Sequence, residues 1–181
     1  MIVGEAVYLT ELDRTNAETV RAWINDPEVN RFLLAGHVPV TREAEERFYD
    51  SADTSTDSYH FEIHLSADGR HIGNIGLQAV DLVQRHGEIG LVVGSKDDWG
   101  KGYGAGAIVA CLRFAFFTLG LHSVSIRTDE RHERALELYP RLGFVQTGRE
   151  RERIYREGRF VDHVVFDMLD REFRARYHPD D

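Results

Sequence analysis

Cysteine is almost absent from this sequence, and no long apolar run is present. Cys111 is the only cysteine among 181 residues, so no internal disulfide can form and a disulfide-stapled secreted domain is excluded. A membrane-spanning helix needs about 18 or more consecutive apolar residues, and the sequence contains no such run. The first residues also lack the basic and then apolar order of a secretion signal. We therefore expect a cytoplasmic protein with no membrane segment.

Basic residues are outnumbered by acidic ones. The chain has 22 Lys and Arg against 31 Asp and Glu, a formal net charge of −9 at pH 7. Such a charge repels the phosphate backbone of nucleic acids and suits a cationic partner. Nine histidines are scattered along the chain. His60 and His64, four positions apart on a predicted strand, would lie about 13 Å apart, too far to share a zinc ion. We expect neither a nucleic-acid partner nor a bound metal.

Apolar periodicity predicts a mixed α+β fold in one domain spanning residues 1–181. Hydrophobic residues make up 42% of the chain, which is enough for one core. Alternating patterns predict strands, and helical spacing predicts helices. The predicted strands cover residues 5–12, 59–65, 71–77, 88–93, 122–128, 144–155 and 160–169, and the predicted helices cover 15–24, 41–49, 107–117 and 132–142. The charged residues 170–181 are expected to form a peripheral C-terminal tail.

Turn residues and connection lengths predict how these strands pair. One β-hairpin is expected within residues 59–77, and a second closes the fold within 144–169. The strand at 122–128 should run parallel to the strand at 88–93, because a helix crosses between them. In the closing hairpin, the alternating charges of residues 149–153 predict arginines on one face of the strand and glutamates on the other.

The glycine-rich run Trp99-Gly100-Lys101-Gly102-Tyr103-Gly104-Ala105-Gly106 lies between a predicted strand and a predicted helix. Glycines let a ligand approach the backbone, and the first turn of a helix offers free N–H groups at the positive end of its dipole. This order predicts a site for a phosphate or pyrophosphate. Residues 102–107 also fit the dinucleotide fingerprint G-x-G-x-x-A, with Asp129 as the ribose-binding acid. Against that alternative, residues 95–99 separate the glycines from the strand. The glycines could also serve only a tight turn and close helix packing.

Two signatures together resemble those of the GNAT N-acetyltransferase superfamily. Residues 99–104 look like its acetyl-CoA loop [QR]-x-x-G-x-[GA], and residues 135–145 are similar to its second signature, A-x-x-L-Y-x-x-x-G-F ahead of a strand. The chain as a whole resembles the branch that contains the ribosomal-protein N-terminal and the spermidine acetyltransferases. Three positions depart from the pattern: Trp99 replaces Gln or Arg, His132 stands where Asn is common, and Pro140 interrupts the second helix. The resemblance implies one GNAT-like domain, with a mixed, mostly antiparallel sheet of about seven strands flanked by about four helices.

The resemblance also implies acetyl-CoA as co-substrate and a set of site residues. Tyr139 takes the position of the family's general acid, which protonates the departing thiolate. Backbone groups of residues 91–93 would pair with the pantetheine arm, and amides of residues 100–106 would hold the pyrophosphate. The expected cofactor-binding residues are Leu91, Val92, Val93, Trp99, Gly100, Lys101, Gly102, Tyr103, Gly104, Ala105, Gly106, His132, Arg134, Ala135 and Tyr139.

The general base is less defined by the sequence. Glu88 is a carboxylate at the start of an apolar strand beside the glycine run, and the related enzymes often have glutamate here. It could deprotonate the acceptor amine through a water, orient the acceptor, or serve as a structural hydrogen-bonding group. Cys111 falls on the apolar face of the helix predicted at 107–117, which favours a buried thiol and direct transfer over a covalent step.

The function expected from these residues is direct transfer of an acetyl group from acetyl-CoA to a primary amine, preferably a protein or peptide N-terminus. Small polyamines and amino-sugars or antibiotics are alternative acceptors. A non-catalytic acyl-CoA-binding regulatory module and a dinucleotide-dependent oxidoreductase are alternatives of other classes, and a homodimer is a possible assembly. In the resembling family the first two helices flank the acceptor slot. Asp26, Glu28, Glu45 and Glu46 in this region either attract a cationic acceptor or merely face water.

Overall fold

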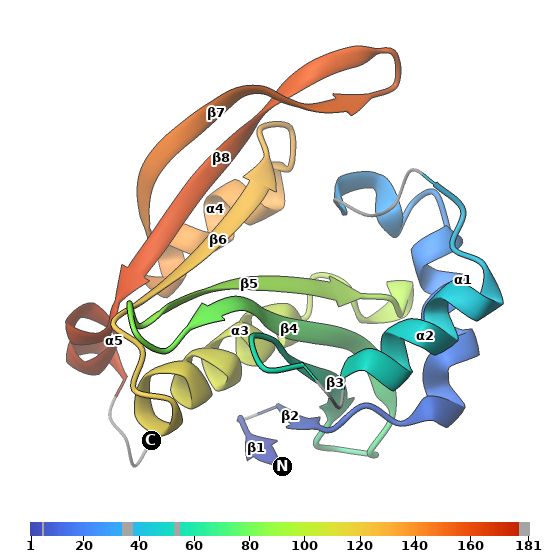
Figure 1. Ribbon diagram of the computed structural model, residues 1–181, viewed down its shortest axis with the longest axis horizontal. Coiled ribbons are helices and arrows are strands. Elements are labelled where there is room, and N and C mark those ends of the chain that lie inside the picture. The colour runs from blue at the N-terminus through green and yellow to red at the C-terminus, as the bar shows by residue number, and fades with distance from the viewer. Residues whose placement is uncertain (5, 34–37, 53–54, 178–181) are drawn as a thin grey trace.

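One mixed β-sheet organises the molecule (Figure 1). The computed structural model describes residues 1–4, 6–33, 38–52 and 55–177, so residue 5 of the first predicted strand and residues 178–181 of the predicted tail lie outside the described residues. The strands are β1 (Ile2–Val3), β2 (Val7–Thr10), β3 (Tyr59–Leu65), β4 (His71–Asp81), β5 (His86–Val93), β6 (Ser123–Asp129), β7 (Val145–Arg156) and β8 (Arg159–Leu169), in the spatial order β1-β2-β3-β4-β5-β6-β8-β7. The α-helices are α1 (Ala17–Asn25), α2 (Arg42–Ala52), α3 (Tyr103–Arg113), α4 (Glu133–Leu142) and α5 (Asp170–Arg176).

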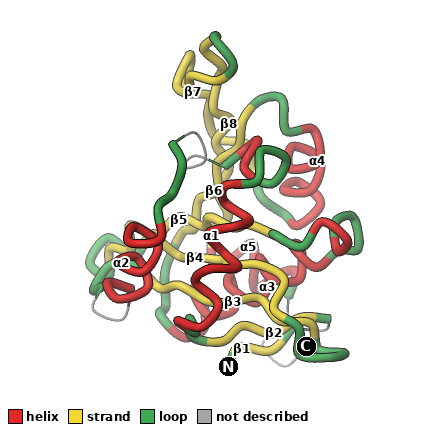
Figure 2. Tube along the Cα trace, turned by 90° about the vertical axis from the view of Figure 1, so that its right-hand side faces the viewer, coloured by secondary structure: helices red, strands yellow, loops and turns green. Residues whose placement is uncertain are grey.

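The α+β class predicted from the sequence is confirmed. All the paired strands are antiparallel except β5 and β6, which run parallel as predicted. The seven predicted strands are present, and the additional strand, β1, has only two residues. Figures 1 and 2 show that the β7–β8 hairpin, which closes the fold, projects from one end of the molecule.

Helix α5 corrects the prediction that the segment after β8 is peripheral. Phe173 is fully buried, and its ring centroid lies 5.2 Å from that of Phe116 and 5.6 Å from that of Phe117. The Glu172 carboxylate accepts a hydrogen bond from the amide of Leu169 at 2.9 Å and so caps the start of the helix. The aromatic side chain therefore anchors residues 170–176 to the core despite the charged neighbours that suggested a solvated tail.

A bulge in β7 corrects the predicted separation of charges on that strand. The pairing register with β8 shifts between Glu150 and Ile154, and Glu152 has a φ of 52°. A bulge breaks the two-residue alternation on which the prediction depended. As a result, the Nε atom of Arg153 lies 3.6 Å from a carboxylate oxygen of Glu150, an arginine and a glutamate that were predicted to face opposite sides.

The glycine run contributes the first turn of α3. The sequence predicts a helix from residue 107, but α3 begins at Tyr103, directly after Gly102 in the left-handed conformation. Cβ atoms built at Gly104 and Gly106 would lie close to Leu91, Val93 and Val7. Close packing against the sheet therefore stabilises a helical turn that glycine propensity alone disfavours.

Helix α3 fills one face of the sheet with side chains from its apolar stripe. Ala107, Ile108, Ala110, Cys111 and Leu112 are all fully buried and belong to the main core cluster with residues of β2 to β6. A smaller cluster forms where α1 and α2 pack together. No described helix, α3 included, is long and apolar enough to cross a membrane.

The two parallel strands at the centre of the sheet separate along their length. Paired residues run from His86 with Ser123 to Ile89 with Ile126. Beyond them, in the described residues, β5 continues to Val93 and β6 to Asp129 without further pairing between the two. Figure 1 shows the strands diverging toward the end where β5 leads into the glycine run. We refer to this opening, after Ile89 and Ile126, as the fork.

Candidate active site

The glycine loop leads from the open end of the fork to α3. Gly100 and Gly102 have φ angles of 77° and 87°, in the region that favours glycine. A Cβ atom at either residue would meet nothing within 4 Å, so this side of the loop is open. Since the Gly106 amide donates to the Gly102 carbonyl at 3.0 Å, helical bonding begins there. Of the seven amides predicted to hold a pyrophosphate, that of Gly106 is therefore already used by the helix.

Trp99 anchors this loop to β5. Its indole Nε1 donates a hydrogen bond of 2.7 Å to the carbonyl of Val93, and the amides of Gly94 and Ser95 both donate to the carbonyl of Ile72 in β4. The sequence predicts Trp99 as a cofactor contact in place of Gln or Arg. The bond to the Val93 carbonyl fixes the position at which the glycine loop leaves the sheet. A contact between Trp99 and the cofactor stays a prediction.

Tyr139 lies on α4, the helix that follows β6. It is 5% exposed, and its ring centroid lies 5.5 Å from that of Phe166 and 5.9 Å from that of Phe144. Burial raises the pKa of the Tyr139 phenol above its ordinary value, so the group is protonated at neutral pH. Ala135 is buried one turn earlier on the helix, and Pro140 does not end the helix, which continues to Leu142.

Glu88 lies on β5 just before the fork opens. A carboxylate oxygen of Glu88 is 2.8 Å from a guanidinium nitrogen of Arg127 on β6, and Arg127 also lies 3.5 Å from a carboxylate oxygen of Glu150. The sequence left three roles open for Glu88: general base, orienting residue for the acceptor, or structural hydrogen-bonding group. The ion pair with Arg127 supports the structural role. A role for Glu88 as base or in orienting the acceptor stays a prediction.

His132 and Arg134 lie at the start of α4. The His132 ring stacks on Phe32, with centroids 4.2 Å apart and an interplanar angle of 11°, and its Nδ1 lies 3.2 Å from the hydroxyl of Thr128. Burial lowers the pKa of His132 below its ordinary value. The ring thus joins α4 to the segment after α1. Arg134, one residue into the helix, is exposed.

The acids expected near the acceptor slot are mostly engaged by the protein itself. Lys96, in the loop before α3, lies 2.8 Å from a carboxylate oxygen of Asp26 and 2.8 Å from one of Glu28. Glu45 is buried on α2, and burial raises its pKa above the ordinary value. Glu46 is partly exposed. The contacts of Lys96 favour structural roles for Asp26 and Glu28 over recognition of a cationic acceptor. A buried carboxylate oxygen of Glu45 has no hydrogen-bond partner among the described residues, so its role stays open.

Asp129 and Arg156 form a buried ion pair that the sequence did not predict. The Arg156 side chain is 1% exposed and that of Asp129 0%, with Nε and Oδ2 3.4 Å apart. The Arg156 guanidinium also donates hydrogen bonds to the carbonyls of Arg31 and Leu33. Arg131 donates three further bonds to Asp129, of 2.9 to 3.0 Å. Because Asp129 is enclosed in this way, it cannot bind a ribose, which argues against the dinucleotide alternative.

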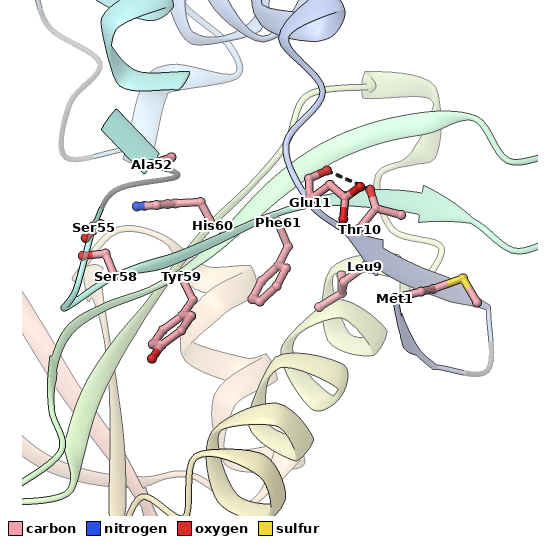
Figure 3. Close-up of a pocket in the computed structure, with 10 residues that line it drawn as sticks. All are labelled: Met1, Leu9, Thr10, Glu11, Ala52, Ser55, Ser58, Tyr59, His60 and Phe61. Atoms are coloured by element: carbon pink, nitrogen blue, oxygen red, sulfur yellow. Dashed lines mark hydrogen bonds between the residues drawn. The ribbon is translucent and has the colours of Figure 1, made fainter. Parts of the chain in front are cut away.

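Two hollows are present on the surface of the described part of the molecule. One of about 310 Å³ is lined by Met1, Leu9, Thr10, Glu11, Ala52, Ser55, Ser58, Tyr59, His60 and Phe61 (Figure 3). The other, of about 630 Å³, is bordered by Arg151, Glu152 and Asp162 at the bulge of the closing hairpin. Neither contains a residue predicted for the site. In the described part of the chain, no group of three or more His, Cys, Asp or Glu side chains could hold a metal.

Comparison with known proteins defines the class of this protein as an N-acetyltransferase. A family model described as the acetyltransferase (GNAT) domain matches residues 7–145, so the chain belongs to the GNAT family and the resemblance seen in its sequence is confirmed. The chain is similar to the putative ribosomal N-acetyltransferase YdaF of Bacillus subtilis, with 28% identity over 177 residues that cover 96% of each chain. It is also similar to the spermidine N(1)-acetyltransferase of Vibrio cholerae, with 27% identity over 63% of this chain and 70% of the relative.

A solved structure shows the same fold. The spermidine N-acetyltransferase from Vibrio cholerae, crystallised in complex with CoA and spermine, superposes with a TM-score of 0.85 over 93% of this chain and 98% of that chain. The two sequences are 20% identical in this alignment, so the likeness extends to the fold and not to the acceptor.

Proposed function

We propose that this acetyltransferase moves the acetyl group of acetyl-CoA directly to a primary amine, preferably the N-terminus of a protein or peptide. The fork is the observation that carries the proposal. Residues 90–93 of β5 lose their pairing with β6 immediately before the glycine loop. An extended chain of alternating amide and methylene groups, such as pantetheine, can pair with such a strand edge as another strand would.

The start of α3 fits the phosphates of CoA. The amides of Tyr103, Gly104 and Ala105 precede the first intrahelical bond, donated by Gly106, and so are free at the positive end of the helix. The Lys101 side chain, 53% exposed, adds a positive charge beside them. Backbone donors and a cation around an open glycine loop are the features that hold a pyrophosphate.

Tyr139 would act as the general acid. Its raised pKa keeps the phenol protonated, so the hydroxyl can donate a hydrogen bond to the departing thiolate and stabilise its charge in the transition state. Cys111 is fully buried, and burial raises the pKa of its thiol to about 12, so a neutral thiol away from solvent is unsuited to a covalent step. These properties support direct transfer between the two substrates.

The contacts of Glu88 and of the acidic residues support an α-amine as the acceptor. An α-amino group, with a pKa near 7.7 to 8.0, is about a tenth neutral at pH 7, whereas an alkyl amine near 10.4 is neutral in about one molecule in 2,500. A polyamine therefore depends more on a general base and on nearby acids. Glu88 is paired with Arg127, and Lys96 forms ion pairs with both Asp26 and Glu28 and so offsets one of their two negative charges. Small polyamines and amino-sugars are the alternative acceptors. The similarity to a spermidine N(1)-acetyltransferase supports the polyamines among them.

A panel of amines at matched concentration tests this function. Peptides beginning with Ser or Ala, spermidine and an aminoglycoside would each be incubated with acetyl-CoA, with thiol release and product mass followed. We expect acetylated peptide from the wild type and much less from Tyr139→Phe, and a reaction without enzyme controls for the uncatalysed transfer. Acetylation of spermidine alone would overturn the preferred acceptor. CoA binding without acetylation of any amine would favour the regulatory module.

A further inference from the structure

A buried carboxylate lies in the middle of the loop that joins β5 to α3. The Asp98 side chain is 1% exposed and accepts hydrogen bonds from two guanidinium nitrogens of Arg70, at 2.6 and 3.3 Å. It also accepts from the Ser95 hydroxyl at 2.6 Å and from the Lys101 ammonium at 3.3 Å. Arg70 belongs to the turn between β3 and β4, 28 positions earlier. A bidentate arginine–carboxylate pair is strong and fixes the relative orientation of the two side chains. The pair therefore holds the loop against the turn between β3 and β4.

The position of Asp98 explains why the loop needs such a contact. Gly100 and Gly102 follow within four residues and both have positive φ angles. Glycine backbones lose more conformational freedom on ordering than other residues do, so a loop that contains them needs contacts that select one conformation. Trp99 bonds to the Val93 carbonyl of β5, while its neighbour Asp98 bonds to Arg70. The loop is therefore held from two directions just before its glycines.

The charges of this cluster suit an anionic ligand. The hydrogen bonds from Arg70 hold the pKa of Asp98 well below its ordinary value, so the carboxylate is ionised at neutral pH. One negative charge then faces two positive ones, from Arg70 and Lys101. Lys101 makes one contact, of 3.3 Å, whereas Arg70 makes two, and Lys101 is half exposed, so its ammonium can turn toward a phosphate while Arg70 keeps Asp98 paired.

We propose that Asp98, fixed by Arg70, is a positioning residue for the CoA site: it sets the loop conformation that presents Lys101 and the first amides of α3 to the phosphates. This role rests on the proposed function, because it requires that the loop bind CoA. Asp98 itself acts through the loop and touches no reacting atom.

The variant Asp98→Asn distinguishes an effect of loop conformation on CoA binding from an effect of charge alone. Removing a negative charge beside a phosphate site should strengthen CoA binding if charge alone mattered. If Asp98 positions the loop, the loss of its charged bonds should instead weaken CoA binding by about tenfold or more. Asp97→Asn is the matched control, since Asp97 is the exposed neighbour of Asp98 in a single 3-10 turn of this loop, Lys96–Asp98, and its substitution changes the net charge equally. We expect Asp97→Asn to bind CoA within about twofold of the wild type.

Kinetics and a second partner complete the test. The KM for acetyl-CoA should rise in Asp98→Asn by the same factor as the CoA dissociation constant from isothermal titration, with kcat and the KM for the acceptor little changed. Arg70→Met should reproduce the effect and Arg70→Lys should restore part of the binding. The double variant Arg70→Met/Asp98→Asn should be no worse than either single one if Arg70 acts through Asp98. Because the Arg70 side chain is half exposed, we expect its variants to fold, and they test the proposal even where Asp98→Asn folds poorly.

The outcomes distinguish the positioning role of Asp98 from the proposed acetyltransferase function on which it rests. If the wild type binds CoA and Asp98→Asn and Arg70→Met bind it equally well, the positioning role is wrong while the acetyltransferase proposal stands. A fall in kcat and in the unfolding midpoint with unchanged CoA affinity would assign Asp98 to general stability and would also overturn the role. If the wild type does not bind CoA, both proposals fail.

Discussion

Replacing Arg156 by methionine should destabilise the protein strongly and loosen the segment after α1. Methionine keeps much of the side-chain volume but removes the buried charge. Asp129 then loses one of its two arginines, and the carbonyls of Arg31 and Leu33 lose their donor. Loss of one partner of a buried ion pair costs about 3–5 kcal/mol. Because Arg131 still donates three bonds to Asp129, we expect the lower end, about 3 kcal/mol.

Chemical and thermal unfolding measure this effect. For a protein of this size, about 3 kcal/mol corresponds to a Tm lower by roughly 6–12 °C. Arg153→Met is the matched control on the same strand, since the Arg153 side chain is 65% exposed and makes only a 3.6 Å contact with Glu150. Its free energy of unfolding should change by no more than about 0.5 kcal/mol.

Limited proteolysis measures the local effect. With its carbonyl released, the backbone around Arg31 should open more often, so trypsin should cleave there faster in Arg156→Met than in Arg153→Met. A Tm within about 2 °C of the wild type, taken as less than about 1 kcal/mol, would refute the inference that Arg156 fixes this segment.

Other predictions follow from single contacts. Tyr139→Phe should lower turnover by about 10²-fold or more with CoA binding nearly unchanged, because only the proton donor is lost; full turnover with chemistry limiting would return Tyr139 to a packing role. Gly94→Ala should lower the Tm, because a Cβ there would lie 1.9 Å from the Trp23 ring; an unchanged Tm would show that the ring moves aside freely. Native Cys111 should react with thiol reagents only on unfolding, and fast labelling would contradict its burial. Asp98 has a lowered pKa, so its stabilisation is present above about pH 4 and is lost as pH falls through the folded value. Below about pH 4 the wild type should therefore lose stability more steeply than Asp98→Asn, and parallel curves would argue against the Arg70 contact.

Much of the fold could be predicted from local patterns in the sequence. Strands with alternating or apolar residues were placed correctly, as was the parallel pairing of β5 and β6, because a helix separates them. Features that depend on distant packing could not be predicted. The start of α3 at Tyr103 needs the sheet behind Gly104 and Gly106, and α5 forms because Phe173 reaches the core. The two residues of β1 are too short to leave a pattern.

In the candidate site, too, some features follow from local patterns in the sequence and others depend on distant contacts. The glycine run and Tyr139 stand in continuous motifs, so the sequence could predict that the run follows a strand and that Tyr139 lies on a helix. Their roles in the site stay predictions. The contacts that define the surroundings join residues far apart in the chain, such as Arg70 with Asp98 and Glu88 with Arg127. Spacing within a motif carries no information about such pairs. Arginine and aspartate are mostly exposed in proteins, so the sequence does not indicate which of them are buried. Only the fold shows which arginine and which aspartate are buried together.

The fork gives this sheet an edge in its interior. Sheet edges expose backbone groups that invite pairing with another chain, and proteins usually keep them short or covered. Here the open length is only residues 90–93, flanked by paired strands. A ligand that continues the hydrogen-bond ladder would act as a missing strand, present in the folded state alone. By mass action, such a ligand at 100 times its dissociation constant would add about 2.7 kcal/mol to the free energy of unfolding. The resistance of the protein to heat should then vary with the concentration of its own substrate.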